Sequence, residues 1–126
     1  MHALIVDDST TIRMILAEHL KKLGFDVTEA VNGRDALERL RGMKQADVVD
    51  VVLVDWNMPE MDGLSFVEAV RAERQYDELP LMMVTTNTEL AHVARALEAG
   101  ANEYIMKPFT RDMIREKLEL LGFIEA

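Results

Sequence analysis

The 126-residue sequence contains no cysteine, which excludes disulfides, cysteine-ligated zinc and thiol chemistry. It also lacks any apolar run near the roughly 20 residues that a membrane-spanning helix needs. Its N-terminus enters a strand-like pattern at once, which leaves no room for a signal peptide. We therefore expect a cytoplasmic protein without a membrane partner.

Positive charge is scarce as well. The 14 lysine and arginine residues are outnumbered by 23 aspartate and glutamate residues, and the net charge is −9. Such a surface repels nucleic-acid phosphates, so we expect no nucleic-acid partner and favour cations and basic protein surfaces. Neither GxGxxG nor GxxxxGK occurs in the sequence, so nucleotide binding has no support.

The length and the hydrophobic content fit one domain. A chain of 126 residues with 49% hydrophobic residues can bury one sizeable core. Apolar patterns occupy nearly all of the chain, without a linker or a low-complexity segment. We expect residues 1–126 to form a single domain with no output domain.

Short apolar runs typical of buried strands alternate with helical patterns along the chain. We predict strands at residues 3–6, 25–30, 51–54, 81–84 and 103–106. Helices are predicted from Ser9 or Thr10 to Gly24, from Asn32 to Gly42, from about Gly63 to about Gln75, from Asn87 or Thr88 to Gly100, and from Thr110 to about Leu121. This alternation predicts an α/β fold with a parallel sheet covered on both faces.

Polar residues follow four of the predicted strands. They are Asp7 and Asp8 after the first strand, Asp55 after the third, Thr85 after the fourth and Lys107 after the fifth. In the strand order 2-1-3-4-5, which we adopt from doubly wound folds, these strand ends converge on one edge of the sheet. Ligands bind at that edge in such folds, so the sequence predicts one shared pocket.

The chemistry of this set favours a metal and a phosphoryl group. Three carboxylates a few Å apart repel one another and need a cation to stay ionised. Oxygen ligands without histidine or cysteine favour Mg²⁺. A lysine and a hydroxyl beside such an ion are suited to phosphoryl transfer, with Asp55 as the nucleophile.

These residues resemble the response-regulator receiver domains of two-component signalling. The resemblance spans nearly the whole chain and rests on the residues named above together with Pro108. The sequence DWNMP around Asp55 is most similar to the chemotaxis response regulators. The resemblance implies a flavodoxin-like (βα)5 fold with a five-stranded parallel sheet in the order 2-1-3-4-5.

The resemblance also implies the phosphoacceptor and its metal. In that family a phosphohistidine of a sensor histidine kinase passes its phosphoryl group to the residue that matches Asp55. The Mg²⁺ cofactor is held, directly or through water, by carboxylates and one backbone carbonyl, which here match Asp7, Asp8, Asp55 and the carbonyl of Asn57.

Further roles follow from the same resemblance. Lys107 pairs with the phosphoryl group, Thr85 moves to hydrogen-bond it, and Tyr104 is the aromatic residue that moves with Thr85. This movement changes the face made by the fourth helix, fifth strand and fifth helix. The Lys107-Pro108 bond is expected to be cis. Thr86 departs from the smaller residue frequent in the family, so we expect slower chemistry.

Simpler structural roles compete with these assignments when each residue is taken alone. Asp7 and Asp8 are equally compatible with an ordinary helix cap, because aspartate is favoured there. Thr85 and Lys107 are weaker signals still, since threonine and lysine end many strands. Their joint placement at the strand ends is what favours a functional site.

Three functions compete for such a site. The preferred one is a stand-alone response regulator that catalyses only its own phosphorylation and dephosphorylation. Its partners would be a histidine kinase and either a flagellar motor switch or a histidine phosphotransfer protein, and we expect a monomer. A Mg²⁺-dependent phosphohydrolase is less favoured, because Asn57 stands where haloacid dehalogenase-type phosphatases carry a second aspartate. An inert scaffold predicts gaps in the pocket set, and the set is complete.

Overall fold

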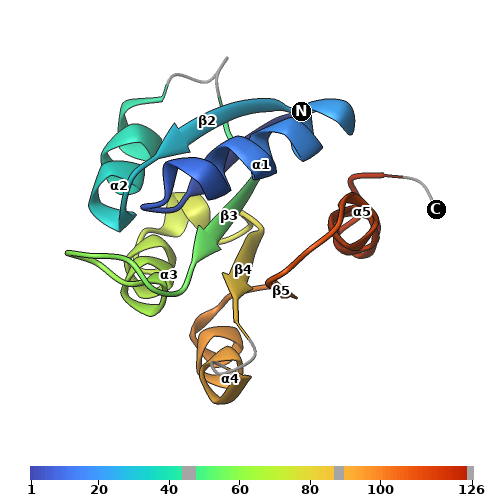
Figure 1. Ribbon diagram of the computed structural model, residues 1–126. Coiled ribbons are helices and arrows are strands. Elements are labelled where there is room, and N and C mark those ends of the chain that lie inside the picture. The colour runs from blue at the N-terminus through green and yellow to red at the C-terminus, as the bar shows by residue number, and fades with distance from the viewer. Residues whose placement is uncertain (44–47, 87–89, 125–126) are drawn as a thin grey trace.

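The computed structural model describes residues 1–43, 48–86 and 90–124, in which strands and helices alternate (Figure 1). The strands are β1 (His2–Val6), β2 (Asp26–Ala30), β3 (Val51–Asp55), β4 (Leu81–Thr85) and β5 (Glu103–Met106). The α-helices are α1 (Thr10–Lys22), α2 (Gly33–Gly42), α3 (Gly63–Arg71), α4 (Leu90–Ala99) and α5 (Arg111–Leu120). A short 3₁₀ helix, η2 (Arg74–Tyr76), follows α3.

The strands form one parallel sheet in the order β2-β1-β3-β4-β5. The register pairs Val6 with Val54, then Asp55 with Val84, and Thr85 with Met106. The carboxyl ends of β1, β3, β4 and β5 therefore lie at one edge of the sheet. The predicted flavodoxin-like fold and strand order are confirmed.

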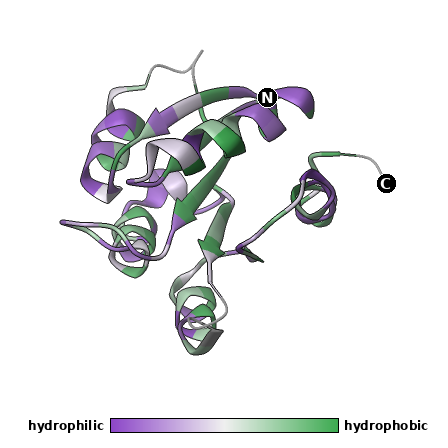
Figure 2. Cartoon of the chain, in the orientation of Figure 1, coloured by the Kyte–Doolittle hydropathy of each residue, from purple (hydrophilic) through white to green (hydrophobic). Residues whose placement is uncertain are grey.

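The helices cover both faces of the sheet (Figure 1). Side chains alternate across β1, so that Leu4 and Val6 join one core cluster whereas Ala3 and Ile5 join the other. The first cluster lies against α2, α3 and α4, and the second lies against α1 and α5. Figure 2 shows hydrophobic residues along β3 and β4, whereas the helices around them carry both hydrophobic and hydrophilic residues. Both faces of the central strands are buried, which explains their continuous apolar runs.

Side-chain caps begin four of the helices, as the sequence patterns indicated. The cap side chain accepts a hydrogen bond from the backbone N–H three residues later, and the residues concerned are Ser9, Asn32, Asp62 and Thr110. The predicted caps Asn87 and Thr88 lie outside the described residues. Gly24 and Gly100 follow α1 and α4 with φ of 96° and 124°, the left-handed conformation expected of a glycine stop.

The end of the third helix was predicted wrongly. We expected it to reach about Gln75, but α3 ends at Arg71 and the chain turns into η2. The Arg71 guanidinium donates to the carbonyl oxygens of Tyr76 at 2.6 Å and Leu79 at 2.8 Å. These bonds hold the following segment in a tight turn that apolar periodicity alone does not reveal.

No helix among the described residues is long and apolar enough to cross a membrane.

Candidate functional site

Three carboxylates converge at the carboxyl edge of the sheet. Asp7 and Asp8 follow β1, and Asp55 is the last residue of β3. One carboxylate oxygen from each lies within 4.8 Å of the other two, close enough to share one ion. Asp7 is 1% exposed and Asp55 is 6% exposed, whereas Asp8 is open to solvent. The predicted convergence of the two strand ends is confirmed.

Lys107 completes the cluster from the end of β5. Its Nζ lies 3.2 Å from Asp55 Oδ1 and 3.8 Å from Asp7 Oδ2. The bond to Pro108 is cis, as predicted. One ammonium therefore sits beside two carboxylates, which leaves an excess of negative charge in the cluster.

The surroundings of the Asp7 carboxylate are those expected of a metal ligand. Its Oδ1 accepts a hydrogen bond from the backbone N–H of Ser9 at 2.8 Å. Its Oδ2 is buried and has no hydrogen-bond partner. A buried carboxylate oxygen without such a partner is costly unless a cation compensates it. The all-oxygen donor set suits a hard divalent ion, so the residues present fit Mg²⁺.

The surroundings raise the pKa of both buried carboxyl groups. Burial is the largest cause for Asp55, followed by the charge of Asp7, and together they raise its pKa to about 6. The Lys107 ammonium and the backbone N–H of Asn57 act in the opposite direction. Burial also raises the pKa of Asp7, against the lowering effects of Ser9, Lys107 and Arg13. Without a cation, the cluster resists full ionisation near pH 6.

The remaining predicted residues lie around this cluster. Thr85 is buried at the end of β4, the strand next to Asp55, and its hydroxyl donates to the Thr86 carbonyl at 3.4 Å. Asn57 is exposed and hydrogen-bonds Asp55 through its backbone N–H, while the metal role of its carbonyl stays a prediction. Tyr104 is half-buried in the edge strand β5, opposite Met83 of β4, and lies outside the acidic cluster.

Two contacts of the site were missed from the sequence. Trp56, which follows Asp55, is only 7% exposed and stacks on His92 of α4, with ring centroids 4.9 Å apart. A side chain on Gly63 would lie 2.7 Å from the Asp55 carbonyl oxygen. Stacking between distant residues leaves no periodic signal, but a glycine at a helix start hints at close backbone approach.

A third missed residue is Arg13, in the first turns of α1. Its Nη1 donates to the carbonyl oxygen of Asp7 at 2.7 Å, so it contacts the backbone between two of the clustered aspartates. The signal available in the sequence was its position, one helical turn after the Ser9 cap and close to the acidic pair.

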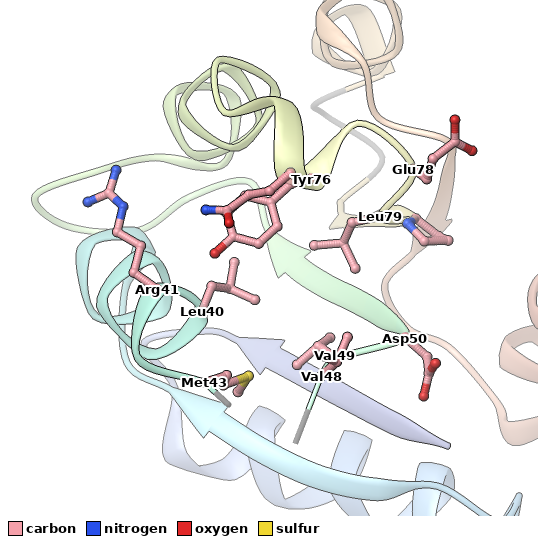
Figure 3. Close-up of a pocket in the computed structure, with 11 residues that line it drawn as sticks. Leu40, Arg41, Met43, Val48, Val49, Asp50, Tyr76, Glu78 and Leu79 are labelled. Carbon is pink, nitrogen blue, oxygen red and sulfur yellow. The ribbon is translucent and has the colours of Figure 1, made fainter. Parts of the chain in front are cut away.

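One cavity lies away from the acidic cluster. It has a volume of about 460 Å³ and is lined by residues such as Leu40, Val49, Asp50, Tyr76 and Leu79 (Figure 3). Asp50 precedes β3, so the cavity lies at the edge of the sheet opposite Asp55. A shallower groove of about 330 Å³ adjoins the acidic cluster through Lys107. The volume of a cavity alone would therefore have misplaced the functional site. The polar residues of the acidic cluster locate it.

The chain is similar to known proteins in sequence and in fold. Residues 3–119 match the response regulator receiver domain family. A chemotaxis protein CheY homolog of Campylobacter jejuni is 50% identical over 120 residues, which cover 94% of this chain and 90% of the relative. The solved chemotaxis response regulator CheY4 of Vibrio cholerae has a TM-score of 0.85 at 34% identity, over 95% of this chain and 97% of that chain.

A further solved relative carries a metal. The receiver domain of a Pseudomonas aeruginosa sensor histidine kinase, with a magnesium ion in its active-site cleft, is 27% identical with a TM-score of 0.83. The similarity covers 94% of this chain and 94% of that chain. From its sequence match, its sheet order and its acidic cluster, the present chain belongs to the response regulator receiver domains, in their CheY-like form.

Proposed function

We propose that this chain is a phosphorylation-switched signalling module in which Asp55 accepts a phosphoryl group from a histidine kinase. The observation that carries the proposal is the buried Asp55 carboxylate, which lies beside the Asp7 and Asp8 carboxylates and the Lys107 ammonium. A nucleophile, a metal-type ligand set and a cation for phosphoryl oxygens thus meet at one point.

The chemistry assigns each of these groups a part. A carboxylate oxygen of Asp55 attacks the phosphorus atom, and the phosphorus–nitrogen bond to the donor imidazole breaks. The nitrogen keeps the electron pair and takes up a proton. Asp7, Asp8, Asp55 and the Asn57 carbonyl would hold Mg²⁺, which, when bound, neutralises charge on the phosphoryl oxygens. The Lys107 ammonium pairs with Asp55 before the reaction and is placed to pair with those phosphoryl oxygens during it.

An apolar groove next to Lys107 offers the phosphodonor a docking surface close to Asp55. The groove is lined by Ile12, Ile15, Lys107, Pro108 and Phe109, and Ile15 is 40% exposed. A protein donor that packed on these side chains would bring its phosphohistidine next to Lys107. This surface supports a protein as phosphodonor.

The conformational change would reach a partner protein through the surface formed by α4, β5 and α5. Thr85 ends the strand beside Asp55, and we propose that it moves to hydrogen-bond the phosphoryl group while Tyr104 follows it. The Tyr104 ring lies 4.7 Å from the Lys117 ammonium of α5, so its movement would alter contacts of that helix. Phosphorylation would thereby shift the population of two surface states that a partner distinguishes.

We propose chemotaxis as the setting, with a flagellar motor switch as the downstream partner. The support is the chemotaxis naming of the relatives that match this chain at about half of its positions. A relay to a histidine phosphotransfer protein is the alternative. Turnover as a phosphohydrolase is disfavoured, because exposed Asn57 stands where those enzymes carry an acid–base aspartate.

The single tryptophan permits a direct test of the acceptor. Trp56 fluorescence should change when wild-type protein is titrated with Mg²⁺, and again when acetyl phosphate or beryllofluoride is added. Asp55→Asn should lack the second change, because it has no carboxylate nucleophile. An identical second change in both proteins would show that Asp55 is not the acceptor. Steady release of phosphate from generic phosphomonoesters would instead favour the hydrolase.

A further inference from the structure

The Arg13 guanidinium bridges two segments at the edge of the acidic cluster. Its Nε lies 3.1 Å from Glu29 Oε1 of β2, and its Nη1 donates to the Asp7 carbonyl oxygen at 2.7 Å. Its Nη2 also donates to the Thr10 hydroxyl at 3.3 Å. The Arg13 side chain is only 12% exposed, and its charge-assisted bond to the Asp7 carbonyl oxygen is partly buried.

Arg13 contacts the carbonyl oxygen of the peptide unit between the two aspartates. The Asp7 carbonyl belongs to the peptide unit that joins Asp7 to Asp8, the two aspartates of the β1–α1 loop. The orientation of this planar unit sets the directions in which both side chains leave the backbone. The backbone N–H of Asp7 donates to the Ala30 carbonyl at 3.2 Å, so β2 also holds the start of this loop.

The Arg13 donors leave the acidic side chains available to a cation. The three bonds described above go to Glu29, a backbone carbonyl and a hydroxyl. Glu29 offsets the arginine charge at the sheet edge, while the fork of the guanidinium fixes two partners at once. A lysine could not reproduce this geometry, because an ammonium is a single point of charge.

We infer that Arg13 is a positioning residue for the cation site: it fixes the Asp7–Asp8 peptide so that both carboxylates face Asp55. This inference rests on the proposed function, because it requires that the acidic cluster bind Mg²⁺. It extends the site by one residue that contacts backbone and touches neither the metal nor the phosphoryl group.

Removal of the guanidinium separates positioning from electrostatics. Arg13→Met keeps the apolar stem and deletes one positive charge near the carboxylates. If Arg13 acted only through its charge, the variant would bind Mg²⁺ more tightly. Positioning predicts the opposite, a Mg²⁺ dissociation constant about threefold to tenfold higher by Trp56 fluorescence. This lies at or below the roughly 10–100-fold cost of losing a group bonded to a metal ligand, because Arg13 holds the loop backbone.

Two further variants make the test specific. Arg39→Met deletes an arginine of equal charge whose exposed side chain pairs through Nε with Asp35 of α2, at 3.3 Å, and this variant should bind Mg²⁺ like wild type. Arg13→Lys keeps the charge and should still bind about twofold to fivefold more weakly, because it loses the fork. At saturating Mg²⁺, Arg13→Met should regain most of the wild-type rate of modification by acetyl phosphate.

The outcomes separate this inference from the proposed function. No Mg²⁺ response in wild-type protein would overturn the metal site itself. A wild-type response together with equal or tighter binding in Arg13→Met would overturn only the positioning role. Should Arg13→Met lose its cooperative thermal unfolding transition, Arg13→Lys decides alone, and wild-type Mg²⁺ affinity in that variant would refute the inference.

Discussion

Lys107 pairs with Asp55, the carboxylate that we propose as the phosphoacceptor. Its ammonium lies 3.2 Å from Asp55 Oδ1, and its charge lowers a pKa that burial and Asp7 raise. It therefore helps to keep Asp55 ionised before transfer, and we propose that it neutralises phosphoryl oxygens during transfer. Both roles depend on the charge of one side chain that is 24% exposed.

Replacement of Lys107 by methionine should impair the acceptor in two measurable ways. The rate of modification by acetyl phosphate at pH 7 should fall at least tenfold, because the transition state loses a cation. The rising limb of the pH–rate profile should also move to higher pH, because the Asp55 pKa rises without the ammonium. Modification by acetyl phosphate, followed by intact-protein mass spectrometry across pH 5–8, measures both effects. An unchanged rate would remove Lys107 from the mechanism.

The start of α3 holds the acceptor strand in place. The backbone N–H of Gly63 donates to the Trp56 carbonyl at 2.9 Å, and Asp62 caps the helix. A Cβ at position 63 would lie 2.7 Å from the Asp55 carbonyl oxygen and 2.9 Å from Trp56 Cα. Backbone atoms cannot move aside as a flexible side chain does, so this position accepts only glycine without a shift of the acceptor loop.

Gly63→Ala should therefore destabilise the fold by about 1–3 kcal/mol in urea unfolding. It should also weaken the Mg²⁺ response of Trp56, because the displaced backbone carries Asp55. Gly42→Ala is the matched control: a Cβ there meets nothing within 4 Å, and alanine is the better helix former. That variant should be as stable as wild type or more stable by up to about 1 kcal/mol. Equal stability of the two variants would contradict the close approach at Gly63.

How far each element could be predicted depends on whether its signal is local. The predicted strands and the left-handed glycine stops at Gly24 and Gly100 agree with the structure, because buried runs and such turns are recorded in neighbouring residues. The end of α3 was missed because Arg71 fixes it through Gly100, Tyr76 and Leu79, which lie 5 to 29 positions away. Local patterns contain no such contact.

The site shows the same division at the scale of the whole molecule. The acidic cluster could be predicted because each member ends an apolar run and one strand order brings those ends together. The contacts of Arg13 and His92 could not be predicted, although Arg13 lies close to the acidic pair in sequence, because the packing of α1 and α4 determines which groups these side chains contact. Chemistry carried by strand ends is therefore readable from the sequence, whereas supporting contacts from helix faces require coordinates.

The buried acidic cluster should also govern how the stability of the whole molecule depends on pH. The Asp55 pKa is about 6 in the fold against an ordinary value of 3.8, so between these values the folded state binds more protons than the unfolded one. The contribution of the Asp55 carboxyl group to the free energy of unfolding is fully present below about pH 3.8, and it is lost as the pH rises through about 6. Removal of the charge should therefore stabilise the metal-free protein at neutral pH.

Asp55→Asn isolates this contribution from the other carboxyl groups. In EDTA at pH 7.5, urea unfolding should show the variant more stable than wild type by on the order of 2 kcal/mol, and the difference should shrink towards pH 4. Millimolar Mg²⁺ should stabilise wild type more than the variant, because a cation that binds only the folded state offsets the repulsion. A difference that stays constant from pH 4 to 7.5 would show that Asp55 ionises in the fold as it does in the unfolded chain, and that burial beside Asp7 carries no electrostatic penalty.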